Sequence, residues 1–191
     1  TDINLISTAS SLHDIGKISI SGDILNKPGR LTAEEFEIIK GHSLIGAKML
    51  SELPLDQQEA PLVKVASDIC RWHHERYDGN GYPDGLKGDE IPIAAQVVAL
   101  ADVYDALTSE RCYKKAYSHS KALEMIFEGR CGAFNPTLLQ CLLEISDTLE
   151  SELGQAALER NARHRRDTKG RIDYDNLLAR EHSVSLVPPS S

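Results

Sequence analysis

Apolar positions recur at helical spacing along most of this chain, and strand-like alternation of apolar and polar residues is almost absent. The clearest helix begins at Thr32, which pairs with Glu35 in a capping box, and runs toward Leu53, where Pro54 ends it. Only residues 18–25 alternate in a way that suggests a short strand. The pattern therefore predicts an all-α domain.

Further helices are predicted on both sides of this one, with a single long interruption. The stretch 78–88 holds four glycines and one proline, so it is predicted to be an ordered loop. Pro92 and Pro136 are suited to the first turns of the helices that follow them. The predicted helices span residues 3–12, 60–74, 93–109, 119–130, and 137 to beyond 149.

The character of the chain changes near residue 155. Arg160–Arg171 is strongly charged, and the last residues, V-P-P-S-S, are typical of a frayed end. We therefore predict a helical domain over residues 1–153 and a charged extension over residues 154–191, with one short helix at Tyr174–Arg180. No internal repeat is visible.

Composition and charge exclude some classes of function and partner. Of 191 residues, 41% are hydrophobic and 26% are charged, and the net charge of −8 argues against a nucleic-acid polymer as partner. An anionic substrate would need local positive charge, which bound metal ions would supply. No apolar run approaches the roughly 20 residues of a membrane span, and no signal peptide is visible. Four scattered cysteines without a C-x-x-C pair indicate reduced thiols, so we expect a cytoplasmic protein.

Histidine and aspartate residues at wide intervals form a candidate metal centre. They occur in H-D-I-G-K, as an isolated histidine, in H-H-E-R-Y-D-G-N-G-Y-P, and in the apolar run V-V-A-L-A-D-V-Y-D-A-L. Intervals of roughly 30 residues exclude a local zinc-finger clip and suit a bundle whose helices each contribute ligands. The six candidates are His13, Asp14, His42, His73, His74 and Asp102.

Each candidate also has an ordinary structural explanation. A single histidine such as His42 is more often a core or surface residue than a ligand. Asp102 is harder to explain, because a buried unpaired carboxylate costs several kcal/mol and needs a cation or hydrogen bonds. Asp105 could supply that shell or orient a ligand histidine. Asp14 could bridge two ions, since both of its oxygens accept a cation.

Taken together and in this order, the motifs resemble those of the HD-GYP family, metal-dependent phosphodiesterases that degrade cyclic di-GMP. The resemblance runs from about Ile6 to Pro136 and includes N-K-P-G-R-L-T and G-L-K-G-D-E-I-P. It implies an all-α bundle of the HD type with a binuclear centre held by the six candidates. It implies two ions, most simply iron, although the ligand chemistry equally suits manganese or zinc. The acidic residue that binds a third metal in some members lies further upstream than this sequence reaches.

The resemblance also implies a mechanism. Two ions would activate a bridging hydroxide for in-line attack on phosphorus, with Asp14 as the bridging ligand. Lys17 follows His13 by four residues, one turn of an α-helix, so both would face the same centre. Its ammonium would stabilise charge on the phosphate. Family positions near the substrate match residues that shape the entrance or contact phosphate and guanine. These are Asp78, Gly81, Tyr82, Pro83, Arg111 and Lys114.

Three functions remain open on the sequence. The first is hydrolysis of cyclic di-GMP to linear pGpG and on to GMP; the second is hydrolysis of another cyclic dinucleotide or nucleotide; the third is a non-catalytic sensor. Arg111 and Lys114, as bare residues, equally suit a solvated helix end. The resemblance further implies that the G-Y-P loop docks diguanylate cyclase domains. Only 12 residues precede His13, which is short for this family, and the resemblance implies an upstream regulatory domain.

Overall fold

The computed structural model describes residues 2–110 and 115–152. Arg111 and Lys114 lie outside this part of the chain, as do the extension over 154–191 and the short helix predicted within it.

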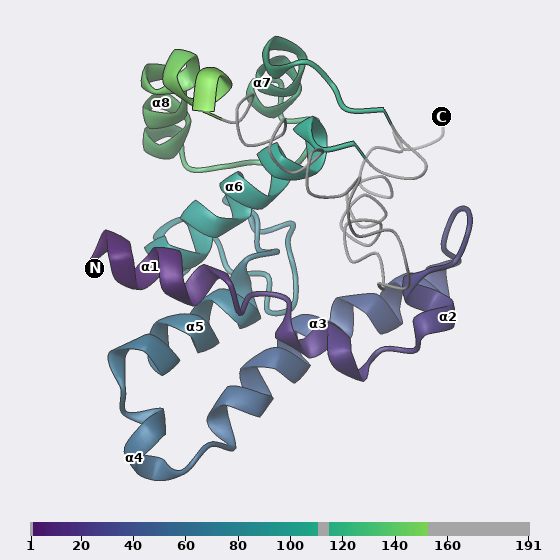
Figure 1. Cartoon of the computed structure of the whole chain (residues 1–191), viewed down its shortest axis with the longest axis vertical. Helices are drawn as coiled ribbons and strands as arrows, with labels where there is room; N and C mark the ends of the chain where they lie inside the picture. The colour runs from purple at the N-terminus through teal and green to yellow at the C-terminus, as the bar shows by residue number, and fades with distance from the viewer. Residues whose placement is uncertain (1, 111–114, 153–191) are drawn as a thin grey trace, which may run out of the picture.

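The described part of the chain is helical, as predicted, and contains no β-strand beyond one isolated bridge between Arg130 and Gly132. Within it, no helix combines the length and the apolar character that a membrane span requires. Figure 1 shows the arrangement of the elements. In chain order they are α1 (Ile3–Ser10), η1 (Ile15–Ser19), α2 (Gly22–Leu25), α3 (Ala33–Ser51), α4 (Leu55–Gln58), α5 (Pro61–Trp72), η2 (Gly88–Glu90), α6 (Ile93–Thr108), α7 (His119–Phe127) and α8 (Pro136–Glu144).

The short strand predicted over residues 18–25 is wrong. These residues form the end of the 3₁₀ helix η1 and the one-turn helix α2, which Ser21 caps through the backbone N–H of Asp23. Two apolar residues of this stretch, Ile20 and Leu25, are buried in a cluster with Ile39 of α3. The stretch therefore forms a capped helix start. No strand exists among the described residues with which it could pair.

Helix ends decide where the candidate ligands lie. The first helix stops at Ser10, two residues before its predicted end, so His13 and Asp14 lie in a turn. The helix α5 stops at Trp72, which makes His73 its C-cap. The last predicted helix is interrupted by a turn at Ile145, after which helical backbone resumes over residues 146–152.

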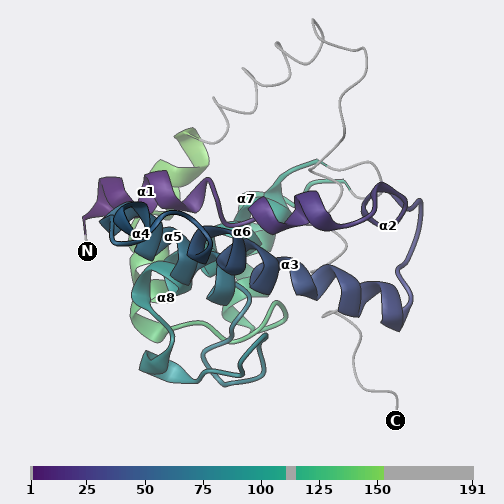
Figure 2. The ribbon, with the colours of Figure 1, turned by 90° about the horizontal axis from the view of Figure 1, so that it is seen from below.

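The helix α5 lies at the centre of the half of the molecule that carries the candidate ligands. It packs against α1, α3 and α6, and α3 also packs against η1. Seen from below in Figure 2, the connection from α5 to α6 projects away from α1 and α2. A second apolar cluster joins α6 to α7 and α8. The ligand-bearing segments thus meet around α5, and α6, which carries Asp102, connects them to this second cluster.

Gly16 allows η1 to approach α3 closely. A Cβ atom at Gly16 would lie 2.0 Å from the carbonyl oxygen of His42 and 2.6 Å from the backbone nitrogen of Gly46. Only a residue without a side chain fits between these backbones. This contact brings the turn that carries Asp14 next to the helix that carries His42.

Candidate metal centre

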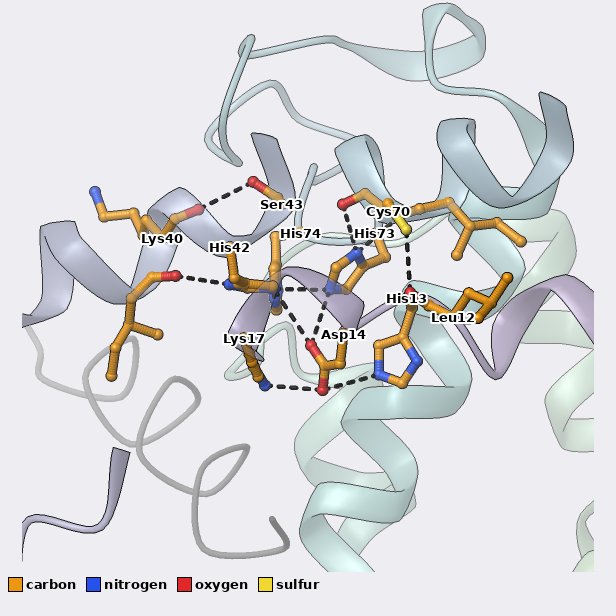
Figure 3. Close-up of polar contacts among 12 residues, drawn as sticks. Leu12, His13, Asp14, Lys17, Lys40, His42, Ser43, Cys70, His73 and His74 are labelled. Carbon is orange, nitrogen blue, oxygen red and sulfur yellow. Dashed lines mark hydrogen bonds and ion pairs between the residues drawn. The ribbon is translucent and has the colours of Figure 1, made fainter. Parts of the chain in front are cut away.

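Three histidine side chains converge in the interior. Their ligating atoms, one from each of His42, His73 and His74, all lie within 4.8 Å of one another, and all three residues are buried. The Nε2 atom of His42 lies 3.4 Å from Nε2 of His73 and 3.2 Å from Nε2 of His74. Figure 3 shows these rings meeting between α3 and the end of α5. Ligands from distant positions in the sequence therefore form one cluster.

Backbone carbonyls set the orientation of the rings. In three histidines, Nδ1 lies within hydrogen-bond distance of the carbonyl three or four residues earlier. The contacts are His13 with Ser10 O at 2.7 Å, His42 with Ile39 O at 2.7 Å and His73 with Ile69 O at 2.8 Å. A carbonyl only accepts, so Nδ1 carries the hydrogen and Nε2 is the atom that points into the centre, where it can offer a lone pair to a cation. Converging lone pairs repel unless a cation lies between them, and the arrangement therefore fits a metal ion.

Asp14 links the two sides of the centre. Its Oδ1 lies 3.3 Å from Nε2 of His42 and 3.9 Å from Nε2 of His73. Its Oδ2 lies 3.2 Å from Nε2 of His13 and 2.8 Å from Nζ of Lys17. Oδ1 is buried and makes no hydrogen bond within the described part of the chain. A carboxylate with one oxygen toward each group of histidines is arranged as a bridging ligand would be.

The electrostatics favour the ligand forms of these side chains. Burial and the neighbouring histidines lower the pKa of His73 to about 3 and also lower that of His74, so both rings are neutral. Burial opposes ionisation of Asp14, but the Lys17 ammonium and the His13 ring outweigh it and hold the pKa of Asp14 well below its usual value. Neutral imidazoles beside an ionised carboxylate are the states that bind a metal cation.

Lys17 lies at the centre as expected, but on the 3₁₀ helix η1 and not on an α-helix. It is 2% exposed, and Nζ donates to Oδ2 of Asp14 across three residues of a 3₁₀ turn. The predicted alignment with His13 on an α-helix is therefore wrong, because no α-helix joins them. The outcome is nevertheless a buried ammonium at the centre, paired with the central carboxylate.

Asp102 lies on α6 and is 9% exposed. Burial lowers the pKa of His13, but Asp14 and, after it, the charge of Asp102 raise this pKa to about 9. The charge of Asp102 also acts on His73 and His74, which is consistent with a place at the same centre. For Asp105 the contact found among the described residues is with Ser109, whose Oγ donates to Oδ1, and not with a ligand histidine. The orienting groups are instead the backbone carbonyls, which no sequence pattern could identify.

The G-Y-P loop forms a wall next to the histidines. The Tyr82 ring stacks on the His74 ring with centroids 4.7 Å apart and planes 22° apart, and a cis peptide bond joins it to Pro83. A Cβ atom at Gly81 would lie 2.3 Å from the backbone nitrogen of Arg76, so glycine is required there. Asp78 is exposed and accepts hydrogen bonds from Asn80. Three of the four predicted entrance residues thus lie in a loop segment that packs on the centre, and Asp78 lies on its outer side.

The model of the HD domain family matches residues 2–138. The chain belongs to the HD domain family. This match covers every candidate ligand and the G-Y-P loop, so the family expected from the sequence is confirmed.

Similar curated proteins share this HD domain. A "Probable cyclic di-GMP phosphodiesterase" of Vibrio cholerae is 45% identical over 75% of this chain and 33% of its own length. The "Cyclic di-GMP phosphodiesterase response regulator RpfG" of Xanthomonas campestris is 42% identical over 81% of this chain and 39% of its own length. A "3'3'-cGAMP-specific phosphodiesterase 2" of Vibrio cholerae is 39% identical over 75% of this chain and 27% of its own length. The chain thus spans less than half the length of each of these relatives.

Proposed function

We propose that this HD domain is a metal-dependent phosphodiesterase that opens cyclic di-GMP to linear pGpG, with or without further cleavage to GMP. The observation that carries the proposal is the convergence of imidazole Nε2 atoms around the ionised carboxylate of Asp14. The names of the relatives, most of them cyclic di-GMP phosphodiesterases, support the substrate.

The donor set suits two divalent ions. The three-histidine cluster, with Oδ1 of Asp14, would hold one ion, and His13 and Asp102, with Oδ2 of Asp14, would hold the other. Mixed imidazole and carboxylate donors suit iron, manganese or zinc, and we infer iron from the family. When bound, the ions lower the pKa of a coordinated water and neutralise charge on the phosphoryl oxygens.

Lys17 would provide a fixed positive charge for a non-bridging phosphoryl oxygen. Asp14 holds its ammonium at 2.8 Å, and its burial keeps competing water away from the pair. A preorganised charge in such a site stabilises the transition state more than a solvated one would. Asp14 and Lys17 therefore have catalytic roles in this proposal, one as bridging ligand and the other as electrostatic stabiliser.

The loop would form one side of the substrate entrance. Tyr82 and Pro83 are partly exposed above the His74 ring, and Gly81 allows the loop to lie close to the chain beneath it. Asp78 would complete the rim on the outer side. Roles for Arg111 and Lys114 in binding phosphate or guanine remain proposals on residues outside the described part of the chain.

A second substrate is favoured by a specific observation: relatives named as 3'3'-cGAMP-specific phosphodiesterases are 34–39% identical to this chain. Both substrates are cyclic dinucleotides with two phosphodiester bonds, so the centre itself does not discriminate between them. Discrimination would rest on contacts to the bases.

The test is turnover by protein loaded anaerobically with iron(II) or manganese(II). Cyclic di-GMP, 3'3'-cGAMP and bis-p-nitrophenyl phosphate are compared by their kcat/KM values. We expect the highest value for cyclic di-GMP. A higher value for 3'3'-cGAMP would favour the second substrate, and bound metals without hydrolysis of either dinucleotide would exclude both enzymatic functions.

We further propose that the domain works in the cytoplasm. A second proposal concerns the exposed side of the loop, which includes Asp78 and Asn80 and would dock diguanylate cyclase domains. The exposure of Asp78 and Asn80 supports the docking proposal. Loss of binding of a purified diguanylate cyclase domain by the Asn80→Ala variant, with turnover retained, would test it.

A further inference from the structure

Glu75 is a buried carboxylate that the proposed metal chemistry does not use. It follows His74 directly and is 2% exposed. Its Oε1 accepts hydrogen bonds from the backbone N–H groups of Asp84, at 2.7 Å, and of Gly85, at 3.0 Å. Oε1 of Glu75 therefore connects the residue directly after His73 and His74 to Asp84 and Gly85, which follow Pro83 in the G-Y-P loop.

This placement is unfavourable for the side chain itself. Burial raises the pKa of Glu75, although the backbone N–H groups of Asp84, Gly85 and Leu86 act in the opposite direction. Its Oε2 is buried and makes no hydrogen bond within residues 2–110 and 115–152. A buried carboxylate with one oxygen unsatisfied weakens the fold compared with a fully satisfied group, so simple stabilisation does not explain it.

The side chain of Asp84 is also bound, by two residues at the end of α5. Arg71 donates Nε and Nη2 to the two carboxylate oxygens of Asp84, at 2.7 and 2.9 Å, and Trp72 donates Nε1 to Oδ2 at 2.7 Å. The end of α5 thus binds the side chain of Asp84, while Glu75 binds its backbone. Together these contacts fix the loop to the segment 71–75 on two sides.

These contacts of the loop place Tyr82 against His74. Its backbone N–H donates to the carbonyl of His74 at 3.3 Å, and its ring stacks on the His74 ring. In the other three histidines Nδ1 contacts a local carbonyl, and in His74 one face of the ring is covered by Tyr82 of the loop. The loop is therefore part of what orients this imidazole.

We propose that Glu75 is a positioning residue: it holds the loop against the His73–His74 segment, so that Tyr82 keeps the His74 ring oriented toward the metal. This deepens the proposed function and depends on it only in that His74 serves as a ligand. Residues that orient metal ligands typically contribute 10–100-fold to metal affinity.

Trp72 gives a direct readout, because it is the single tryptophan of the chain and its indole binds Asp84. The variants are Glu75→Ala, which removes the contact, and Glu75→Gln, which keeps an acceptor oxygen at the same reach. Glu90→Ala is the matched control, since Glu90 also accepts from a backbone N–H in this region, that of Lys87, away from the histidines. Each full chain is examined by Trp72 emission and acrylamide quenching, by circular dichroism and by manganese(II) titration.

For Glu75→Ala we expect unchanged helicity, red-shifted and more readily quenched Trp72 emission, and manganese affinity about 10–100-fold lower. Glu75→Gln and Glu90→Ala should resemble the wild type in both readouts. Wild-type emission and affinity in Glu75→Ala, or equal losses in Glu75→Gln and Glu75→Ala, would overturn the proposal.

If Glu75→Ala loses its helicity, Glu75→Asp takes its place, because it keeps the charge and shortens the reach by one methylene. The proposal requires Glu75→Asp to be impaired in both readouts and Glu75→Gln to be near normal, and the reverse order would overturn it. Neither readout uses a nucleotide. A wrong substrate would therefore appear as intact metal binding without turnover, distinct from failure of the Glu75 contact.

Discussion

The histidine centre and the G-Y-P loop lie side by side but are held in different ways. In the centre, the rings of His42 and His73 are oriented by carbonyls three or four residues earlier in their own helices. In the loop, Asp84 is held by side chains nine to thirteen residues away, at the end of α5. Ligand orientation in the centre thus follows from helix geometry, whereas the loop depends on a few polar side chains.

The two regions also differ in charge and solvent. The centre combines neutral buried imidazoles with one ionised carboxylate and a buried ammonium, so removing a single member leaves another without its partner. The ion pair between Arg71 and Asp84 is partly exposed, and water can replace either partner. Substitutions in the centre should therefore have large effects, and those in the loop should have graded ones.

The largest effect is expected for Asp14→Ala. This change removes the carboxylate that faces both groups of histidines, so bound iron or manganese should fall and turnover should drop by about 1000-fold or more. Metal analysis and kcat measure the two losses. Asp23→Ala, an exposed aspartate in the first turn of α2, is the control and should change neither. Normal metal content with normal turnover in Asp14→Ala would contradict the assignment of the centre.

Lys17→Ala should separate charge stabilisation from ligation. The ammonium contacts a ligand and is not one itself, so both metals should stay bound while kcat falls by roughly 100-fold. The exposed Lys48 offers a control, and Lys48→Ala should leave kcat unchanged. Loss of metal in Lys17→Ala would show that its main role is to hold Asp14 in place.

Gly16→Ala tests the scaffold that places Asp14 beside His42. The added Cβ would lie 2.0 Å from a backbone oxygen of α3, which cannot move without shifting His42. We expect the free energy of unfolding to fall by about 3 kcal/mol, measured by urea denaturation. Gly22→Ala is the matched control, because the nearest atom to its Cβ, Nδ2 of Asn26, is 3.7 Å away. Equal stability of the two variants would show that η1 and α3 do not touch as described.

The smallest effect is expected for Asp84→Ala, which removes the outer contact of the loop. Its ion pair with Arg71 is partly exposed, so the free energy of unfolding should fall by about 1 kcal/mol or less. The hydrogen bond from Arg71 lowers the pKa of Asp84 from its usual 3.8. The stability difference from the wild type should therefore be complete above pH 3.8 and shrink as the pH falls below it. A difference that grows on acidification would contradict this contact.

Local signals in the sequence determined a large part of this fold. The capping box of Thr32 and Glu35 forms at the start of α3 as predicted, Pro136 begins α8, and Pro92 directly precedes α6 as its N-cap. These features depend on neighbouring residues only, which is why the sequence shows them. Wrong boundaries arose at Ser10 and Ile145, where short-range patterns continue but the backbone turns.

For the candidate site, the sequence by itself determined which residues could bind a metal, since side-chain chemistry and motif order are visible in it. The tertiary structure alone decided how they meet: Asp14 enters from a turn, Gly16 lets that turn touch α3, and the three Nε2 atoms converge. It also decided that Glu75 is buried and bound to the loop. The physical reason is that close approaches between distant segments depend on how whole helices pack, whereas helical periodicity specifies only which face of each is apolar.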